Sequence, residues 1–229
     1  SSPSASFVFK YCVDKGPDAQ APIIVGPNPV TLPDGVPIGY NQSSMGIEVY
    51  VNEPSECKWA HDRDLDFGQM EGNMSCSSSV FEMNAQMLYK CTTTLTSIKN
   101  GVKNDFYFRC KDKPKALKDR NVMSKGYKFT VQGTQPLVID EIKPNGTIRD
   151  STSPAKITLN VKTSAGYKEG DATCYYSDSC FTSGGKKDKY TMFYYAQGTS
   201  SYTHAQDLWV EQGNYQCSVR CVDFGGNTD

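Results

Sequence analysis

An internal repeat with a period of about 110 residues constrains the fold of this chain more than any other feature. In the first copy, Cys-Lys-Trp at 57–59 is followed by Phe-Arg-Cys-Lys-Asp at 108–112. In the second copy, Cys-Tyr-Tyr at 174–176 is followed by Val-Arg-Cys-Val-Asp at 219–223. The 229 residues therefore divide into an N-terminal segment (1–20) and two equivalent modules in tandem, module one (21–134) and module two (135–229).

Both modules carry the period-two alternation of half-buried β-strands. Apolar residues occupy every second position in segments 47–51 and 157–161, and turn-forming clusters at 99–101 and 182–186 separate such runs. The 14 Tyr and 10 Phe residues also favour strands over helices. Several short strands in each module predict an all-β fold of two tandem antiparallel β-sandwiches, of the immunoglobulin or fibronectin type.

The cysteines of module two fit this fold as disulfides. Cys174 and Cys180 are an even number of positions apart, as are Cys217 and Cys221, so each pair is expected to face one side of its strand. In an antiparallel strand pair the sum of facing residue numbers stays constant, and it is nearly constant for Cys174–Cys221 and Cys180–Cys217. These two disulfides are therefore predicted to join neighbouring strands, with a small bulge taking up the difference.

The repeat transfers the same pairing to module one. Cys57 is then predicted to pair with Cys110, which leaves Cys76 to pair with Cys91 and leaves Cys12 unpaired. Disulfides in this number indicate an oxidising, extracellular compartment. The sequence contains no apolar run long enough to span a membrane.

Module two also resembles a known family. Three stretches carry the resemblance: Ala-Thr-Cys-Tyr-Tyr-Ser at 172–177, Thr203-His204 before Leu208, and Gly-Asn-Tyr at 213–215 with the closing Gly-Asn-Thr at 226–228. They are similar to the immunoglobulin/fibronectin type III-like modules of large bacterial and archaeal cell-surface proteins. Module one matches less closely after Asp112, where Lys-Pro replaces Phe-Gly-Gly-Asn. The resemblance implies a scaffold displayed at the cell surface in an adhesin, stalk or filament, and it implies no particular ligand.

Asp62, Asp64 and Asp66 alternate directly after the first Cys-Lys-Trp and are a weak candidate for a calcium site. The EF-hand pattern is not met, because Phe67 stands where that loop needs glycine and Asn73 where it needs a bidentate glutamate. A polar surface loop is the stronger interpretation. We therefore expect no metal and no other cofactor.

The sequence does not indicate catalytic residues. His61 and His204 are single imidazoles far apart in the sequence, without a nucleophile or a carboxylate pair at a useful spacing, and the cysteines form no Cys-X-X-Cys pairs for zinc. Cys12 stands in an alternating run with no activating group nearby. The formal net charge of -1 gives no overall attraction to nucleic acid. We predict a non-enzymatic protein that does not bind nucleic acid.

Two sets of residues are candidates for contact with the surroundings. Sequons for N-glycosylation begin at Asn41, Asn73 and Asn145, and they predict exposed loops. A tyrosine cluster in module two is a candidate binding face for a glycan or a protein, although sheet surface and core explain most of it more simply. Its members are Tyr175, Tyr176, Tyr190, Tyr194, Tyr195 and Tyr202.

The two modules differ at their last strand. In module one, Tyr-Lys-Phe-Thr-Val at 127–131 alternates and is predicted to be the final strand of the sandwich. Module two has no matching run after Asp223, whereas an alternating run at 6–13 precedes module one without a module of its own. The donor residues of this run are Phe7, Val8, Phe9, Tyr11 and Val13.

The N-terminal run is therefore predicted to be the final strand of another module. Either it completes module two of a neighbouring copy, as in strand-complemented fibres, or it belongs to a preceding module of a longer tandem array. Donation between copies is head-to-tail and gives open filaments rather than closed rings.

These observations favour a structural segment of an extracellular surface filament or stalk, whose partners are further copies of itself or adjacent modules. One alternative is an adhesin module that binds a glycan or a protein on another cell. A second alternative is an accessory domain of a larger secreted enzyme.

Overall fold

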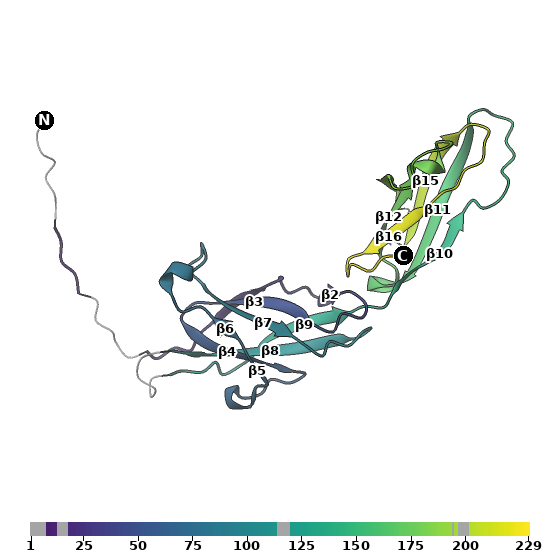
Figure 1. The fold of residues 1–229 in the computed structure, drawn as a ribbon. Coiled ribbons are helices and arrows are strands. Elements are labelled where there is room, and N and C mark those ends of the chain that lie inside the picture. Colours follow the sequence, from purple (N-terminus) through teal and green to yellow (C-terminus); the bar gives the residue numbers. More distant parts are fainter. Residues whose placement is uncertain (1–7, 13–17, 114–119, 194, 197–201) are drawn as a thin grey trace, which may run out of the picture.

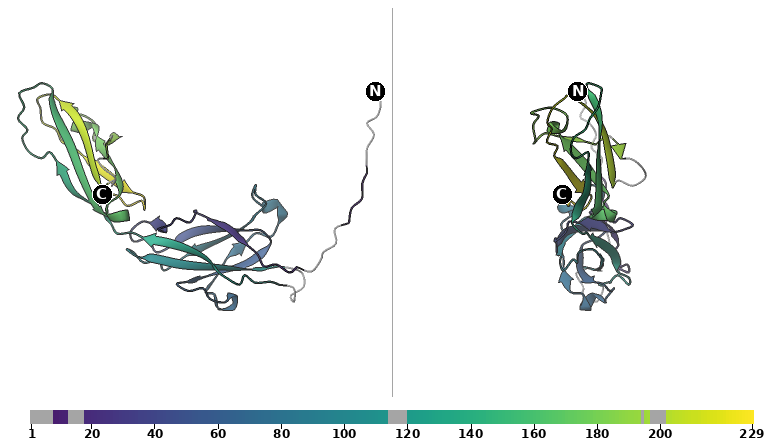
Figure 2. Two further views of the ribbon diagram at one scale, coloured as in Figure 1. Left: turned by 180° about the vertical axis from the view of Figure 1, so that it is seen from behind. Right: turned by 90° about the vertical axis from the view of Figure 1, so that its right-hand side faces the viewer.

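The computed structural model describes residues 8–12, 18–113, 120–193, 195–196 and 202–229, and it shows an all-β chain. Two sandwiches follow one another lengthwise with a bend between them (Figures 1 and 2), and each has its own apolar core. Short 3-10 turns connect strands: η1 (Phe67–Gln69), η2 (Val80–Glu82), η4 (Tyr167–Glu169) and η5 (Asp178–Cys180). Within the described ranges, no helix has the length and apolarity needed to cross a membrane.

Module one is built from two facing sheets with the strand orders β1-β3-β7-β6 and β2-β9-β8-β4-β5. The first sheet contains β1 (Ile24–Asn28), β3 (Met45–Val51), β7 (Tyr89–Leu95) and β6 (Ser75–Cys76). The second contains β2 (Val36–Ile38), β9 (Tyr127–Gly133), β8 (Lys103–Asp112), β4 (Ser55–His61) and β5 (Gly72–Asn73). This is the strand order A-B-E-D facing C-F-G that defines the immunoglobulin sandwich.

The core of module one follows from the alternation in its strands. Val49 and Val51 of β3 are fully buried, and they face Phe106 and Phe108 of β8 and Phe129 of β9, which are also fully buried. Burial of each such side chain stabilises the fold by about 1.5–3 kcal/mol. The final strand predicted at 127–131 is thus a central part of this core.

Strand β2 depends on β9. It lies at the edge of its sheet and pairs in parallel with β9, with Val36 beside Val131 and Ile38 beside Gly133. This pairing turns Ile38 into the core, where it is 5 % exposed. The parallel strand was not foreseen from the sequence, because Pro37 interrupts its short apolar run.

Module two repeats most of this arrangement. One sheet has the order β10-β11-β15-β14, and the other has the order β13-β12-β16. The first sheet contains β10 (Leu137–Lys143), β11 (Ala155–Ala165), β15 (Thr203–Val210) and β14 (Tyr195–Ala196). The second contains β13 (Tyr190–Met192), β12 (Ala172–Ser177) and β16 (Val219–Asp223). These strands match A-B-E-D and C-F of module one.

No strand within the described part of module two takes the place of β9. The bridge between Lys111 and Val122 in module one recurs as the bridge between Val222 and Thr228 in module two. Segment 227–229 therefore occupies the positions of 121–123, which directly precede β9. Beyond this point β16 has strand neighbours on one side only, and it is 5 residues long where β8 has 10.

The N-terminal run also has no strand partner among the described residues. Residues 8–12 form no strand, and Val8, Phe9 and Tyr11 are 85 %, 81 % and 80 % exposed. A β-strand needs a neighbour for its backbone hydrogen bonds, and none of the described sheets supplies one here. Phe7 and Val13, the other two donor residues, lie outside the described residues.

Candidate assembly surface

The structure contains four disulfides, and they join the same cysteines that the repeat and the strand geometry predict. Cys57 faces Cys110 across β4 and β8, and Cys174 faces Cys221 across β12 and β16. The four bonds are Cys57–Cys110, Cys76–Cys91, Cys174–Cys221 and Cys180–Cys217. Cys12 is free and exposed.

One part of the geometric argument was wrong. Cys180 was expected on the same strand as Cys174, but β12 ends at Ser177 and Cys180 lies in the turn η5. The turn forms because Phe181 and Thr182 donate backbone hydrogen bonds to the Asp178 carbonyl. Cys180 still reaches Cys217, because the chain curls towards the segment that precedes β16.

The two disulfides of module one meet in the core. The Cys91 sulfur lies 3.5 Å from the Cys57 sulfur, so the disulfide of one sheet contacts that of the other. The sulfurs of Cys57, Cys76 and Cys91 lie within 4.8 Å of one another. All three belong to disulfides, so they offer no thiolate to a metal ion.

Two aspartates of the run after β4, Asp64 and Asp66, contact Arg109. Asp64 Oδ1 accepts a hydrogen bond of 2.8 Å from Arg109 Nε, and its Oδ2 accepts one of 2.9 Å from the Gly126 amide. Asp66 lies 3.4 Å from Arg109 Nη1. The hydrogen bond from Arg109 lowers the pKa of Asp64, against the opposing effect of burial. The weak calcium candidate is therefore a pairing of two carboxylates with a buried guanidinium, and Asp62 lies apart from it in a loop.

The two histidines lie in different modules. His61 Nδ1 is 2.6 Å from Glu71 Oε2, and its Nε2 is 2.7 Å from the Thr96 carbonyl oxygen. Both neighbours are acceptors, so the protonated imidazolium satisfies both. Burial opposes the charge of His61, but these two hydrogen bonds together raise its pKa. His204 is buried beside the ring of Phe193.

The remaining sequence candidates are scattered. Asn41, Asn73 and Asn145 are all exposed. Tyr176 is buried against Phe181 and Phe193, and Tyr175 is half-buried on the same strand. Tyr190 is exposed on β13 and Tyr202 is exposed in the turn before β15, whereas Tyr194 and the side chain of Tyr195 lie outside the described residues. The described tyrosines therefore do not form a single face.

The outer side of β16 is an open sheet edge. Cys221 and Asp229 exchange two backbone hydrogen bonds, of 3.0 and 3.2 Å, which close the edge at one point. Segment 214–220 continues past this point, and the described part of the chain supplies no strand on its outer side. By the repeat, Cys217 and Val219 take the places of Phe106 and Phe108; Cys217 is exposed and Val219 half-buried, whereas both phenylalanines are fully buried.

Asn227 joins the two modules. Its backbone amide and its Nδ2 donate hydrogen bonds of 2.8 and 2.7 Å to the buried carboxylate of Asp223. The same Nδ2 donates to Thr134 Oγ1 at 2.8 Å, and the Oδ1 accepts from the Tyr40 amide of module one at 2.6 Å. One side chain of module two thus holds both the linker and a turn of module one.

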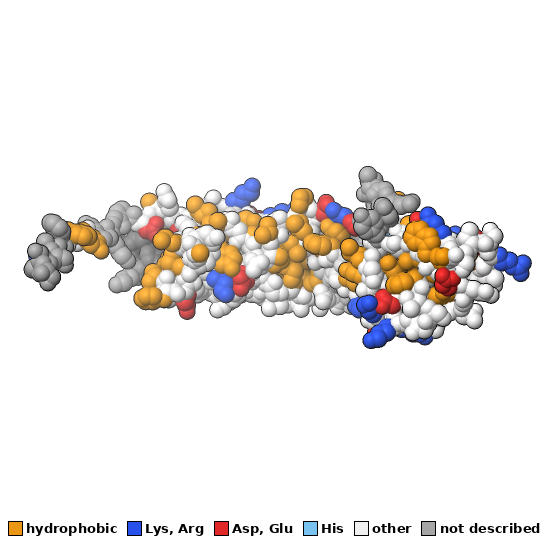
Figure 3. Space-filling model, turned by 90° about the horizontal axis from the view of Figure 1, so that it is seen from above, with side chains coloured by type: hydrophobic (Ala, Val, Ile, Leu, Met, Phe, Trp, Pro, Cys, Tyr) orange, Lys and Arg blue, Asp and Glu red, His pale blue; other side chains and the backbone are white. Residues whose placement is uncertain are grey.

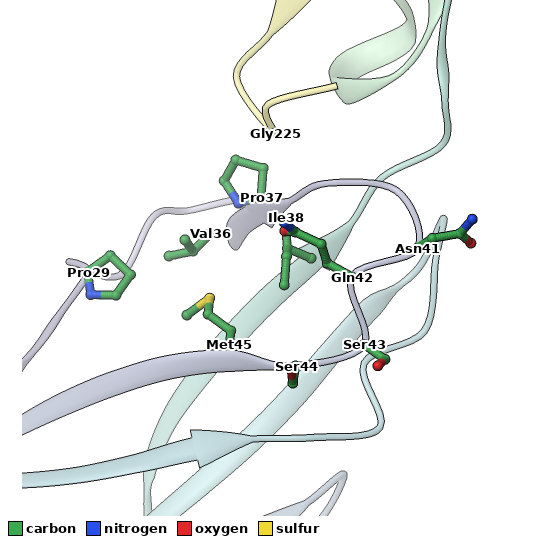
Figure 4. Close-up of a pocket in the computed structure, with 10 residues that line it drawn as sticks. All are labelled: Pro29, Val36, Pro37, Ile38, Asn41, Gln42, Ser43, Ser44, Met45 and Gly225. Atoms are coloured by element: carbon green, nitrogen blue, oxygen red, sulfur yellow. The ribbon is translucent and has the colours of Figure 1, made fainter. Parts of the chain in front are cut away.

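A hollow of about 580 Å³ lies beside this junction (Figure 4). The turn at Gly225 approaches module one so closely that a Cβ at Gly39 would lie 3.2 Å from the Gly225 carbonyl oxygen. Lys168 adds an ion pair of 3.3 Å with Asp34 across the same junction. The lining residues are Pro29, Val36, Pro37, Ile38, Asn41, Gln42, Ser43, Ser44, Met45 and Gly225.

An Asp–Asn contact like that of Asp223 and Asn227 lies at the opposite end of module one. Asp112 is buried, and it accepts hydrogen bonds of 2.8 and 3.0 Å from the backbone amide and the Nδ2 of Asn121. This Nδ2 also donates to the Asp18 carbonyl oxygen at 3.1 Å, in the segment that precedes the module. Each module therefore uses an Asp–Asn pair to hold the stretch of chain that precedes it. The two pairs stand at equivalent positions of the repeat, but they were not predicted from the sequence.

Comparisons with known proteins give no family for this chain. No family model matches it, and no curated protein matches it. Among solved structures, 38 chains match, including a marsupial T cell receptor with a TM-score of 0.44 and 11 % sequence identity. That alignment covers 82 % of this chain and 65 % of the receptor chain, so this chain spans less than two thirds of the receptor chain.

Proposed function

We propose that this chain is a structural, non-catalytic segment of an extracellular surface filament or stalk, made of immunoglobulin-like modules and completed by strand complementation between successive copies. The observation that carries this proposal is the edge of β16, which no described strand covers at the position where module one has β9. An unpaired sheet edge presents free backbone donors and acceptors to an incoming strand.

The N-terminal run has the chemistry of the strand that is needed. Phe-Lys-Tyr-Cys-Val at 9–13 matches Tyr-Lys-Phe-Thr-Val at 127–131 position by position: aromatic, lysine, aromatic, small and valine. In β9, Phe129 and Val131 face the core and Lys128 faces solvent. By this match, Tyr11 takes the place of Phe129 and faces the core of the recipient module, and Lys10 stays in water. Phe9 takes the place of the half-buried Tyr127, which packs against the edge of the core.

Docking removes a large apolar exposure. The described part of the N-terminal segment projects from the end of the molecule with its apolar side chains in solvent (Figure 3). Burial of Phe9 and Tyr11 in a recipient module stabilises the complex by about 1.5–3 kcal/mol for each ring. The backbone hydrogen bonds to β16 add directionality.

The orientation of the modules suits an open-ended assembly. Module two begins at the end of module one where β9 finishes, and the chain enters module one at its opposite end (Figure 1). Both modules therefore point the same way along the chain. A contact that repeats this head-to-tail step joins different surfaces of successive copies and does not close on itself.

We propose an extracellular location because of the disulfides and the immunoglobulin-like fold. Four disulfides in a chain of 229 residues are typical of proteins from an oxidising compartment. The adhesin alternative lacks an equivalent observation, because the described tyrosines do not gather on one face. Further copies of the chain are the partners that the open edge favours.

Deletion of residues 1–15 tests the proposal. We expect the full chain to form higher-mass species or filaments in light scattering and electron microscopy, and the deleted chain to remain monomeric. A full-length variant with Phe9→Asp and Tyr11→Asp is the matched control, and it should also remain monomeric because neither ring can enter a core. Equal assembly by all three chains would overturn strand complementation.

A further inference from the structure

The junction between the two modules contains an ion pair besides the hydrogen bonds of Asn227. Lys168 Nζ lies 3.3 Å from Asp34 Oδ2. Asp34 stands in the connection between β1 and β2, and Lys168 stands in the connection between β11 and β12. We call the end of a module that meets the next module its outgoing end, and the end that meets the preceding module its incoming end. At this junction the outgoing end of module one supplies the acid, and the incoming end of module two supplies the base.

The incoming end of module one has an acid in the corresponding connection. Glu53 lies between β3 and β4, the strands that module two repeats as β11 and β12. A carboxylate oxygen from each of Asp18, Glu53 and Asp112 lies within 4.8 Å of the other two. Burial, and then the charges of Asp18 and Asp112, raises the pKa of Glu53. Carboxylates at this spacing repel one another, so a cation brought to this end is stabilising.

The bases described at this end leave the repulsion in place. Lys113 follows Asp112 in the sequence and Arg120 precedes Asn121, but neither contributes to the pKa of Glu53, which is only raised. The ion pairs of the described residues include neither base. Within the described residues, module one therefore supplies no partner of opposite charge for Glu53.

The outgoing end of module two carries an exposed arginine. Loop 144–154, between β10 and β11, lies at the end of module two that is far from the junction (Figure 1), and all of it is exposed. It is the counterpart of the segment before β3 that holds Asp34, because β11 repeats β3. Counting back from these two strands, Arg149 takes the place of Gly39, which lies against Gly225 of the next module. Arg149 forms no ion pair with any described residue.

The two outgoing ends and the two incoming ends thus differ in the sign of their charges. Inside the chain, the outgoing acid Asp34 meets the incoming base Lys168. The two ends that remain offer the outgoing base Arg149 and the incoming acid Glu53. Any other combination places like charges opposite each other, which disfavours the wrong partner. The charges therefore favour a strict alternation of module one and module two.

We propose that the outgoing end of module two binds the incoming end of module one of a second copy, through an ion pair of Arg149 with Glu53 and Asp18. This contact is the charge-reversed counterpart of the junction inside the chain. The inference rests on the proposed function for the head-to-tail order of the copies. It adds a second contact besides the donated strand, and this contact selects module one over module two as the next neighbour.

The spacing before module one leaves room for the arginine. The residue that the asparagine of module one holds, Asp18, stands four positions before Pro22. The residue that the asparagine of module two holds, Thr134, stands two positions before Pro136. The two additional residues span up to about 7 Å between module one and the module before it. This space takes the side chain of Arg149, whereas the internal junction brings two glycines together.

Two charge-reversed chains test the ion pair. Arg149→Glu and Glu53→Lys each place like charges at the contact, so each chain alone should need about a tenfold higher concentration than the unmodified chain to assemble in light scattering. In an equimolar mixture, the Glu at position 149 of one chain meets the Lys at position 53 of the other, and the unchanged Arg149 meets the unchanged Glu53. Assembly of the mixture should therefore return to about the concentration that the unmodified chain needs.

The mixture is also the control for folding, because a misfolded variant could not restore assembly. Lys162→Glu, on the exposed side of β11, makes the same change of charge as Arg149→Glu at a position away from both ends. This chain should assemble like the unmodified one. A mixture that assembles no better than its two components would overturn the ion pair.

The outcomes separate the ion pair from strand complementation. Unchanged assembly of Arg149→Glu and of Glu53→Lys, with assembly lost on deletion of residues 1–15, would overturn the ion pair and leave strand complementation intact. The reverse pattern would overturn strand complementation and support the ion pair. Loss of assembly in a metal chelator, without an effect of Arg149→Glu, would assign the carboxylates to a metal ion and overturn the ion pair. An unmodified chain that stays monomeric at every concentration would overturn both.

Discussion

Modules one and two share the strands A-B-E-D and C-F and differ at the strand that follows. In module one, β9 covers the core, pairs with the full length of β8 and holds β2. In module two, β16 is half as long as β8, and the counterparts of Phe106 and Phe108 are less buried than those residues. In module one, a single strand therefore organises two neighbours that are far apart in sequence, and the described part of module two contains no strand in that place.

The disulfides are distributed differently in the two modules. Module one has one disulfide in each sheet, and the two touch in the core. Module two has both disulfides between the β16 segment and the β12 side, at Cys174–Cys221 and Cys180–Cys217. Segment 214–223, which has the open edge, thus carries two covalent links, and they restrict its motion while its outer side is unpaired.

The largest expected effect comes from weakening β9, the strand of module one that has no counterpart in the described part of module two. Phe129 is fully buried in β9, and Phe129→Ala should destabilise module one by about 3–5 kcal/mol while leaving module two unchanged. Denaturant unfolding followed by Trp59 fluorescence in a Trp209→Phe background measures this loss. The surface substitution Lys128→Ala on the same strand is the control, with a change within about 0.5 kcal/mol.

The second effect concerns the disulfide that holds the open strand. Removing Cys174–Cys221 with a double alanine substitution should cost module two about 2–4 kcal/mol. Since its core is smaller, calorimetry should show its transition lost or strongly lowered. The equivalent removal of Cys57–Cys110 should leave module one with a measurable transition, because β9 and Cys76–Cys91 remain. Equal loss of cooperative unfolding in both modules would contradict the comparison.

Asn227→Ala should have an intermediate effect at the junction. It leaves the buried carboxylate of Asp223 with fewer donors and removes the contacts with Thr134 and Tyr40, at a cost of about 1–3 kcal/mol. We expect small-angle scattering to show a wider range of inter-module angles. Asn121→Ala removes the equivalent contacts at the outer end of module one, so it should cost similar stability and leave the angle unchanged.

The smallest expected effect is a pH dependence of module one that arises from His61. The folded state raises the pKa of His61 above 6.5, so its stabilisation is complete below that value and disappears as the pH rises through the folded pKa. The transition of module one should therefore weaken on the alkaline side. In His61→Gln this step should be absent. Trp59, whose ring centroid lies 4.9 Å from that of His61, reports the change by fluorescence.

The sequence predicted the features that depend on local alternation and on the repeat. The all-β fold and the final strand at 127–131 follow from residue spacing, because strand periodicity fixes which side chains share a face. Of the cysteine pairs, Cys174–Cys221 follows from strand geometry, Cys57–Cys110 from the repeat and Cys76–Cys91 from elimination. The contact of Asp64 with Arg109 was not predictable in this way, since it joins a loop to a distant strand and Arg220, the counterpart of Arg109, is exposed. The parallel pairing of β2 was missed because its apolar run is too short for a periodic signal.

Hydrogen exchange of segments 103–108 and 214–219, measured on the unmodified chain over a range of protein concentrations, tests the central claim most directly. Segment 103–108 pairs with β9, so its amides should be strongly protected at every concentration. Segment 214–219 should exchange rapidly in dilute solution and gain protection as the concentration rises and a second copy supplies the strand. Protection of both segments at the same level in dilute solution would contradict the account, because the edge of β16 would then be closed without a partner.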